Sequence, residues 1–512
     1  MKNTLKLILA VCFVAAIILS AIPTATAADY NTSYFRYPTE AVYESFGKPG
    51  YAYGQLTVSV NTWVNNNEGG CPMDAVVYWA NESGKLPGYS SLARFKLSTR
   101  ATTFEFSDLQ IIPEGADRLI VYTAIHGTNT LSDKSVVAML PENSAYQSKG
   151  KPIMSFVVLS DTHLRSDDSH SANLKFKDML NDVKTLVPDA AGIFINGDNI
   201  QSNKTTTDLD LPKNQFAKIK EYGKTICPDI PIFMGVGNHD LWPHSYASQL
   251  REIFASVATL PDGSHPDSIH YDFYIDGYHF IFVGDDDNSD PTYAKLSNDT
   301  LEWLDETIAE GYAEDAPNTF IFLHQAVSNT IAGSLTNYGQ EWDGIINAVQ
   351  VRNVLSKYPE TILFSGHSHY TMDSVQNAYS GGSLWPTNFN TASLASVTDH
   401  ENEAQGYIVE IYADTVLVKG MDFAANEWKA SAQYAVSYAE NLGTVTQKPN
   451  NDDLSDEDEN EPKVTKDSAD TTKPSAKKTE AQEGGCGSAL GVGAMMIAVV
   501  PALICFVRKK EE

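Results

Sequence analysis

Five short apolar runs between residues 153 and 364 each end in polar residues that can bind metal ions. Between the first three runs, apolar side chains recur at helical spacing, as at Phe176, Leu180 and Val183. This alternation of apolar strands with amphipathic helices predicts an α/β core whose sheet is buried on both faces. The five runs are Ile153–Leu159, Ile193–Ile195, Ile232–Met234, Phe320–Leu323 and Ile362–Phe364.

The residues that directly follow these runs are the candidate ligands. In open α/β sheets, functional groups gather beyond the carboxyl ends of the strands. Segments that are far apart in the sequence can therefore meet in one pocket. Gly197, Gly237 and Gly366 stand beside the candidates and permit tight backbone geometry there. The candidate ligands are Asp161, His163, Asp198, Asn238, His324, His367 and His369.

The chemistry of this set favours two divalent or trivalent metal ions. Carboxylate, imidazole and amide oxygen suit Mn, Fe or Zn, and no thiolate competes with them. The side chains of Asp161 and His163 can reach one ion, and the carboxylate of Asp198 is placed to bridge two. Two ions about 3.5–4 Å apart would clamp a phosphate and lower the pKa of a bridging water. These ligands leave the identity of the metal open.

The ordered motifs Asp-x-His, Gly-Asp, Gly-Asn-His-Asp, His and Gly-His-x-His resemble those of the calcineurin-like metallophosphoesterase family, over roughly residues 150 to 435. The resemblance implies a four-layer metallophosphoesterase sandwich, in which two mixed β-sheets are flanked by helices. It also divides the ligands between the two ions. The implied ligands are Asp161, His163 and His369 for the first ion, Asn238, His324 and His367 for the second, and Asp198 as the bridge.

The same resemblance implies catalytic roles for His239 and Asp240. His239 would face the substrate, stabilise the phosphoryl oxygens and help to protonate the leaving group, and Asp240 would orient His239. One departure concerns the related purple acid phosphatases, which carry a metal-binding tyrosine three residues after the Asp of Gly-Asp. Gln201 occupies that position, so a ferric–tyrosinate centre is not expected.

The segment before the α/β core has a different pattern, and residues 28–149 are predicted to form a small all-β sandwich domain. Gln55–Val60 alternates between polar and apolar residues, and Ala75–Trp79 and Arg118–Tyr122 are short β-rich runs. The phosphoesterase domain is then expected to cover residues 150–443. The layout of a β domain before this core is similar to that of purple acid phosphatases.

Both ends of the chain carry targeting signals. Residues 1–27 combine an early lysine, an apolar stretch and the small residues Ala25-Thr26-Ala27, which is typical of a secretory signal peptide, although an uncleaved anchor has the same outline. Residues 444–486 are expected to form an acidic disordered stalk. Residues 487–507 are long and apolar enough for a transmembrane anchor, and the basic residues in 508–512 predict a cytoplasmic tail. We therefore expect an exported, single-pass cell-membrane protein with its bulk outside the cell.

Charge and cysteine content exclude some functions. The formal net charge of −29 argues against binding of a nucleic-acid polymer, because no basic face is expected to neutralise phosphates. It does not exclude a small phosphorylated substrate, since bound metal ions can reverse the local field. Cys71 and Cys227 are the only cysteines outside the end segments, so a disulfide framework is not expected.

Several polar residues stay outside the predicted site. His244 and His270 could contact substrate or have a packing role. Asp285-Asp286-Asp287 follows the apolar run Phe280–Val283 and is interpreted as a solvated acidic run without a metal.

The sequence thus predicts an extracellular metal-dependent phosphoesterase that hydrolyses phosphate mono- or diesters by attack of a metal-bridging hydroxide. The alternative is a surface binding or adhesion protein that uses the β domain and keeps a vestigial metallophosphoesterase domain. The metal content of the protein distinguishes the two hypotheses. The natural substrate and the oligomeric state stay open.

Overall fold

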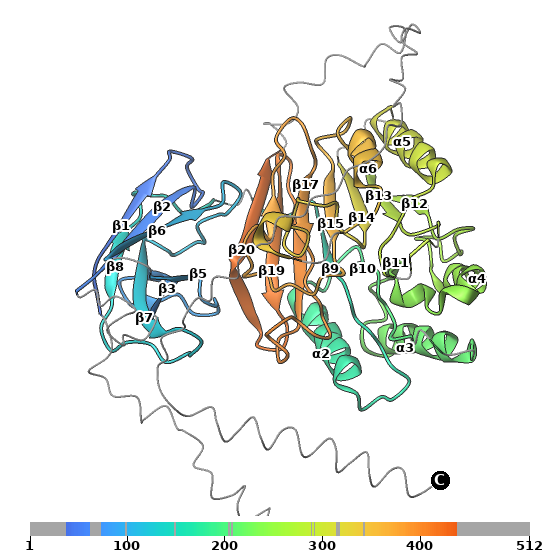
Figure 1. Cartoon of the computed structure of the whole chain (residues 1–512), viewed down its shortest axis with the longest axis horizontal. Helices are drawn as coiled ribbons and strands as arrows, with labels where there is room; N and C mark the ends of the chain where they lie inside the picture. Colours follow the sequence, from blue (N-terminus) through green and yellow to red (C-terminus); the bar gives the residue numbers. More distant parts are fainter. Residues whose placement is uncertain are drawn as a thin grey trace, which may run out of the picture. The chain divides into compact units, whose positions relative to one another are not determined.

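The computed structural model describes residues 37–61, 73–97, 100–147, 150–202, 205, 208–287, 289–290, 292–313, 318–340 and 344–437 (Figure 1). The predicted signal peptide, stalk, transmembrane anchor and cytoplasmic tail lie outside these ranges. Within them, no helix is both long and apolar enough to cross a bilayer.

The N-terminal part of the described chain is all β, as predicted. Its two antiparallel sheets share one core, in which Leu56 and Val58 from the first sheet pack with Val77 and Leu119 from the second. The first sheet has the order β1-β2-β6, with strands Pro38–Ser45, Gly54–Val60 and Ala101–Phe106. The second has the order β4-β3-β7-β8 with β5 beside β3, and its strands are Met73–Asn81 (β3), Gly84–Lys85 (β4), Ala93–Lys96 (β5), Arg118–Ile125 (β7) and Val136–Met139 (β8).

The first sheet of the α/β core has the order β11-β10-β9-β18-β19-β20. Strands β9, β10 and β11 are parallel, whereas β18, β19 and β20 are joined to them by antiparallel pairing. Phe176, Phe216 and Phe254 from helices α2, α3 and α4 are buried against this sheet. The strands are Met154–Leu159 (β9), Ile193–Asn196 (β10), Ile232–Gly235 (β11), Gln405–Ile411 (β18), Thr415–Asp422 (β19) and Glu427–Ser437 (β20), and the helices are Ser171–Leu186 (α2), Asp210–Ile226 (α3) and Ala247–Val257 (α4).

The second sheet has the order β12-β13-β14-β15-β17-β16, with β13, β14, β15 and β17 parallel. Helices α5 and α6 lie together beside its strands in Figure 1. The strands are Tyr271–Ile275 (β12), Tyr278–Val283 (β13), Thr319–Leu323 (β14), Ile362–Ser365 (β15), Ala378–Tyr379 (β16) and Thr387–Asn390 (β17), and the helices are Asn298–Ala313 (α5) and Ala348–Leu355 (α6).

Side-chain alternation along β13 explains why the two sheets pack face to face. Phe280 and Phe282 belong to the core between the sheets, where the Phe280 ring stacks on Phe194 of β10 at 4.6 Å between centroids. Ile281 and Val283 point the other way, into the core beneath α5 and α6. Burying each of these side chains contributes roughly 1.5–3 kcal/mol to the stability of the fold. The resulting order of helices, sheet, sheet and helices confirms the predicted fold class.

Two details differ from the prediction. Strand β9 begins at Met154 rather than Ile153, whose side chain is 61% exposed. The β-rich runs Tyr407–Tyr412 and Thr415–Lys419 predict a hairpin, to which the structure adds a third strand, β20. The outer edge of β20 pairs with the all-β part: the Ile111 N–H donates to Gln433 O at 2.9 Å, and the Ala435 N–H donates to Leu109 O at 3.0 Å. This pairing covers the polar backbone groups of an edge strand.

Candidate metal centre

The carboxyl ends of five parallel strands place all seven predicted ligands. Strand β9 leads to Asp161 and His163, β10 to Asp198, and β11 to Asn238, while β14 and β15 of the other sheet lead to the remaining three histidines. Backbone bonds join these ends, since the Asp161 N–H donates to Gly197 O at 3.1 Å. The His367 N–H donates to Asp161 Oδ2 at 3.0 Å and thereby connects the two sheets.

The first group consists of Asp161, His163 and His369, whose ligand atoms all lie within 4.8 Å of one another. His369 Nε2 is 3.1 Å from Asp161 Oδ1 and 3.0 Å from His163 Nε2. Asp161 is fully buried, and its Oδ1 accepts no hydrogen bond. An oxygen and two nitrogens that converge at such short distances are the donor set of a cation site.

The second group consists of Asp198, His324 and His367, again with ligand atoms within 4.8 Å. His324 Nε2 lies 3.3 Å from Asp198 Oδ2. Asn238 lines the same pocket as Asp198 and His367, and its buried Oδ1 accepts no hydrogen bond. A buried amide oxygen without a partner is costly unless a cation or another donor meets it.

Asp198 connects the two groups through one oxygen atom. Its Oδ1 accepts the backbone N–H of His239 at 2.8 Å. Its Oδ2 lies 3.3 Å from His324 Nε2 in the second group and 3.9 Å from His163 Nε2 in the first. The carboxylate is thus held from one side while its other oxygen faces both groups, which is the geometry that a bridging ligand requires.

Backbone carbonyls orient two of the histidines. His324 Nδ1 is 2.7 Å from Asn196 O, and His369 Nδ1 is 2.8 Å from Ser396 O. Because a carbonyl can only accept, each Nδ1 carries a proton and the neutral ring presents a bare Nε2 to the centre. Such bonds behind metal-binding histidines fix the tautomer and ring orientation. The donor set, the shared oxygen and these carbonyls fit a pair of metal ions.

Backbone strain is concentrated in the same residues. A positive φ costs a non-glycine residue roughly 1–2 kcal/mol, and strained residues cluster at functional sites. Gly366 beside them cannot be replaced without a clash, since an added Cβ would lie 2.0 Å from Ser160 Oγ. The predicted ligands with positive φ are Asp161 (52°), His163 (43°), Asp198 (48°), His367 (69°) and His369 (56°).

The pKa values show how strongly these groups interact without a cation. Burial alone would raise the pKa of Asp161 and Asp198, but the surrounding histidines outweigh burial and hold both pKa values below the usual range. Burial would lower the pKa of His324, yet Asp198 and Asp161 raise it to about 9. Burial lowers the pKa of His163 to about 3 and that of His367 to about 4.

Metal binding is therefore expected to release a proton from His324. With a pKa of about 9, the His324 ring is protonated at pH 7.5 in the folded, metal-free protein. Coordination requires the deprotonated ring, so apparent affinity should increase as pH rises towards 9, by up to tenfold per unit for about one proton released. Calorimetric titration with Zn²⁺ in two buffers of different ionisation enthalpy measures this release. Identical binding enthalpies in both buffers would contradict it.

His239 lies at the edge of the centre but does not contact Asp240 as expected. Its Nε2 is 4.0 Å from Asp198 Oδ2, its ring lies 3.8 Å from that of Trp242, and its Nδ1 is 3.2 Å from Gln201 Nε2. The residue that orients His239 by a hydrogen bond is therefore Gln201.

The fully buried carboxylate of Asp240 instead joins two ligand loops. It accepts the Gly237 N–H at 2.8 Å, the Asn199 side-chain amide at 2.8 Å and the Ile200 N–H at 3.2 Å. Burial and the nearby charge of Asp198 raise the pKa of Asp240 to about 7. The predicted role of Asp240 as the partner of His239 thus differs from the observed bonds, because its oxygens are taken by the loops after β10 and β11.

A pocket of about 290 Å³ opens onto the centre. Its floor contains residues from both ligand groups, and its walls add an indole ring and three hydroxyl groups. The lining residues are Asp198, Asn238, His239, Trp242, Thr292, His367, Ser368, His369 and Thr398.

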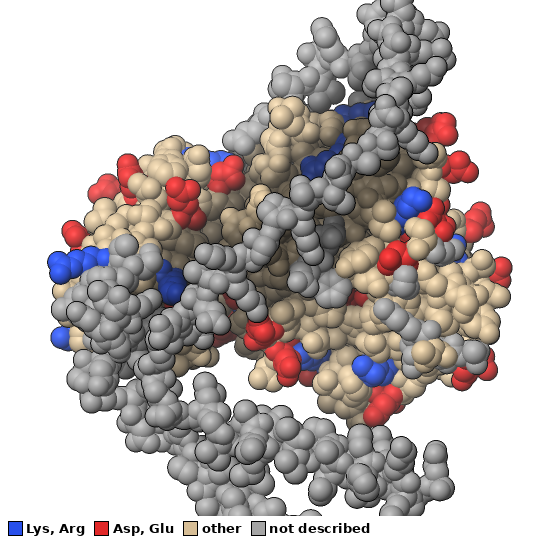
Figure 2. Space-filling view, viewed as in Figure 1, with Lys and Arg blue, Asp and Glu red and all other residues tan. Residues whose placement is uncertain are grey.

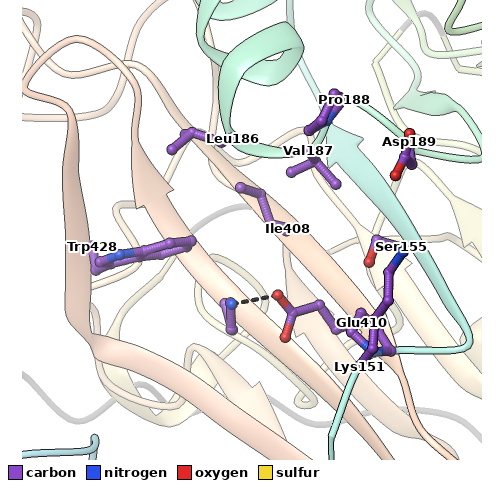
Figure 3. A pocket seen from close by; sticks show the side chains of 11 residues that line it. Lys151, Ser155, Leu186, Val187, Pro188, Asp189, Ile408, Glu410 and Trp428 are labelled. Carbon is purple, nitrogen blue, oxygen red and sulfur yellow. Dashed lines mark hydrogen bonds and ion pairs between the residues drawn. The ribbon is translucent and has the colours of Figure 1, made fainter.

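A second pocket, of about 220 Å³, lies over β9, β18 and β19 and contains none of the predicted site residues (Figure 3). Leu186, Val187 and Ile408 form an apolar wall, and Lys419 is 2.6 Å from Glu410 and 4.7 Å from the centre of the Trp428 ring. The ammonium group beside the tryptophan is thus neutralised by Glu410, and Lys151, Ser155 and Asp189 complete the polar part of the lining.

The interpretation of Asp285-Asp286-Asp287 as a solvated run is wrong. Asp285 is buried, and burial raises its pKa to about 6. Asp286 accepts hydrogen bonds from Ser297 Oγ at 2.6 Å and Thr300 Oγ1 at 2.7 Å, at the start of α5. These carboxylates thus stabilise the N-terminus of α5 through hydrogen bonds. His270, 3.1 Å from Thr300 Oγ1, belongs to this structural cluster.

Fold and site together define this part of the chain as a metal-dependent phosphoesterase domain. Residues 154–371 match the model of the calcineurin-like phosphoesterase family. This region is a calcineurin-like phosphoesterase domain, as the ordered motifs predicted.

Similar solved structures come from several organisms. A conserved uncharacterised protein from Streptococcus pneumoniae TIGR4, described as a predicted phosphoesterase, is 14% identical, with 57% of this chain and 99% of that chain covered and a TM-score of 0.24. Vacuolar protein sorting 29 from Cryptosporidium parvum is 11% identical, with 56% and 98% covered and a TM-score of 0.25. A Vps29 mutant from Entamoeba histolytica is 11% identical, with 56% and 99% covered and a TM-score of 0.23. No curated protein matches the chain.

Proposed function

We propose that this protein is an extracellular phosphoesterase that uses two metal ions to hydrolyse phosphate mono- or diesters. The observation that carries the proposal is the single oxygen, Asp198 Oδ2, that faces both ligand groups at once. One structural ion would not need such a bridge. Gln201 stands where a ferric–tyrosinate centre would need a tyrosine, so that particular centre is not expected, and the ions can be divalent or trivalent.

Residues of this chain have two roles in the proposed reaction: some bind the metal ions, and one transfers a proton. Bound as a pair, the metal ions would lower the pKa of a water and neutralise charge on the phosphate. Asp161 and Asp198 supply the fixed negative charge that holds such cations. His239 stands beside them at the pocket, and its protonated ring can donate a proton from Nε2 to the leaving oxygen and is left neutral; burial lowers the pKa of this ring and so favours release of the proton. Such general acid catalysis contributes typically 10²–10⁴-fold in rate.

The pocket walls support a small ester with an uncharged organic group. Trp242 can stack against a flat ring, and Thr292, Ser368 and Thr398 can donate or accept hydrogen bonds. None of the described lining residues is a lysine or arginine, so additional phosphates beyond the reacting one would find no compensating charge among them. The natural substrate and the preference between mono- and diesters are left to experiment.

Metal analysis with a substrate panel tests the proposal. The full-length protein is loaded with Mn²⁺, Zn²⁺ or Fe²⁺, and its metal content is measured together with turnover of aryl and alkyl mono- and diesters. About two ions per chain with hydrolysis supports the proposal. A chain that takes up no metal and hydrolyses no ester would favour a surface binding protein with a vestigial site.

The extracellular location rests on the sequence of the two ends. The face in Figure 2 carries Lys and Arg side chains scattered among Asp and Glu, which suits exposure to solvent. Protease added to intact cells should cleave the protein from outside, and protection until the cells are lysed would contradict this placement.

Gln201 is expected to influence turnover through His239. Its side-chain amide lies 3.2 Å from His239 Nδ1 and thereby holds the ring in place beside the pocket. Gln201→Leu should lower kcat by about fivefold, which corresponds to the loss of one hydrogen bond of about 1 kcal/mol, without changing metal content. Steady-state kinetics with an alkyl phosphate measures the effect. Gln215→Leu is the control, since Gln215 lies on α3 and its amide contacts only the Gln201 carbonyl; equal kcat in both variants would contradict the role of the Gln201 side chain.

A further inference from the structure

The loop between β17 and β18, residues 391–404, forms one side of the metal centre. Its backbone continues beside β9, since the Leu394 N–H donates to Ser160 O at 3.0 Å and the Ala395 N–H to Asp161 O at 3.2 Å. Ser393 Oγ also donates to Asp161 O at 3.0 Å. The loop therefore contacts the strand end that carries the first ligand pair.

The same loop holds His369 at two points. Ser396 O accepts from His369 Nδ1 at 2.8 Å, and the Thr398 N–H donates to His369 O at 2.9 Å. The orientation of the His369 ring thus depends on where residues 395–398 lie. Ser396 and Thr398 are exposed, whereas Val397 between them is buried, so packing holds this part of the loop at one residue and leaves its polar contacts to hydrogen bonds.

The side chain of Lys175, from α2, binds three backbone carbonyls of this loop. Lys175 Nζ donates to Ala395 O at 2.9 Å, to Glu401 O at 2.7 Å and to Glu403 O at 2.7 Å. An ammonium group has three protons, and all three are used on backbone carbonyls of this loop. Charge-assisted bonds of this kind are roughly twice as strong as neutral ones.

We propose that Lys175 is a positioning residue for the first metal ion: by binding three carbonyls of the 391–404 loop, it keeps Ser396 O where that atom orients His369. This inference rests on the proposed metal centre. The Ala395 carbonyl that Lys175 binds belongs to the peptide unit that ends at Ser396, so displacement of one moves the other. Lys175 has no such contact on the side of the second ion, where His324 is oriented by Asn196 O instead.

The test compares Lys175→Met with Lys177→Met in the full-length protein. Methionine keeps a long apolar stem but removes the three donors. Lys177 is a matched control, since it lies on the same helix and its Nζ donates to a backbone carbonyl, Asp168 O at 3.1 Å, outside the loop. Two readouts are used: stepwise binding of Co²⁺ alone, with His369→Ala as the reference that identifies the first ion, and hydrogen exchange of the Thr398 N–H without metal.

Lys175→Met is expected to weaken the binding step that His369→Ala also weakens, by about tenfold, at the lower end of the effect of outer-shell partners. The other step should match that of Lys177→Met, and Thr398 should exchange faster only in Lys175→Met. Equal weakening of both steps, or binding like that of Lys177→Met, would overturn the proposal. If the wild-type protein binds Co²⁺ but hydrolyses no ester, the proposed function fails while this comparison still decides the role of Lys175.

Discussion

Asp198→Asn is expected to lose the bridged pair of metal ions and to lower turnover by about 10³-fold or more, since metal ions supply several kcal/mol of transition-state stabilisation. Asparagine has nearly the same shape and can still accept the His239 N–H through Oδ1. It lacks the negative charge, and its nitrogen cannot bind a cation at the place of Oδ2. Metal content and turnover should therefore fall together while the fold is retained. Elemental analysis and steady-state kinetics on one preparation measure both.

Asp285→Asn is the matched control for this variant. Asp285 is also a buried carboxylate, but it contacts the Lys295 N–H at 2.9 Å and lies outside both ligand groups. Its variant should keep two ions and full turnover. Retention of metal and activity by Asp198→Asn would remove the physical basis of the proposed function.

His239→Ala should give the second-largest effect, a loss of about 10²–10⁴-fold in kcat for alkyl esters. An alkyl leaving group needs a proton as it departs, and His239 Nε2 is the donor that the geometry provides at the pocket. A p-nitrophenyl ester should lose much less, because p-nitrophenolate is a good leaving group without protonation. Metal content should stay unchanged. The measurement is kcat over a series of esters with leaving groups of increasing pKa. In His239→Ala, kcat should fall more steeply with leaving-group pKa than in the wild type.

His265→Ala is the control for His239→Ala. His265 Nδ1 is 2.6 Å from Ala258 O, away from the pocket lining, so its variant should keep the leaving-group dependence of the wild type. An equal loss for alkyl and p-nitrophenyl esters in His239→Ala would argue against proton donation and favour a role in binding the phosphoryl oxygens.

The ligand set could be predicted from sequence because each ligand sits directly after a buried strand. Strand Ile193–Asn196 is buried along its whole length, and parallel strands bring their carboxyl ends to one edge. The structure brings the seven candidates together there, and metal binding itself stays a prediction. The short spacing within Asp161-Thr162-His163 and Gly366-His367-Ser368-His369 made these motifs recognisable.

Contacts made by long side chains could not be predicted in the same way. Gln201 and His239 are 38 residues apart, and Lys175 reaches carbonyls more than 200 residues away. A carbonyl acceptor has no sequence signal, since every residue carries one. The burial of Asp285 was missed for a related reason: three consecutive acids suggest solvent, whereas the start of α5 supplies the hydroxyl and N–H donors that stabilise them.

The left-handed backbone at the ligands has a consequence for the evolution of such a domain, because stability and function favour different residues there. Five residues are kept in a backbone conformation that non-glycine residues rarely adopt, and glycine at those positions would remove the strain. Substitutions that increase the stability of the fold at these positions would therefore remove the side chains that the metal centre needs. Aspartate and histidine at these positive-φ positions therefore indicate selection for function and not for stability.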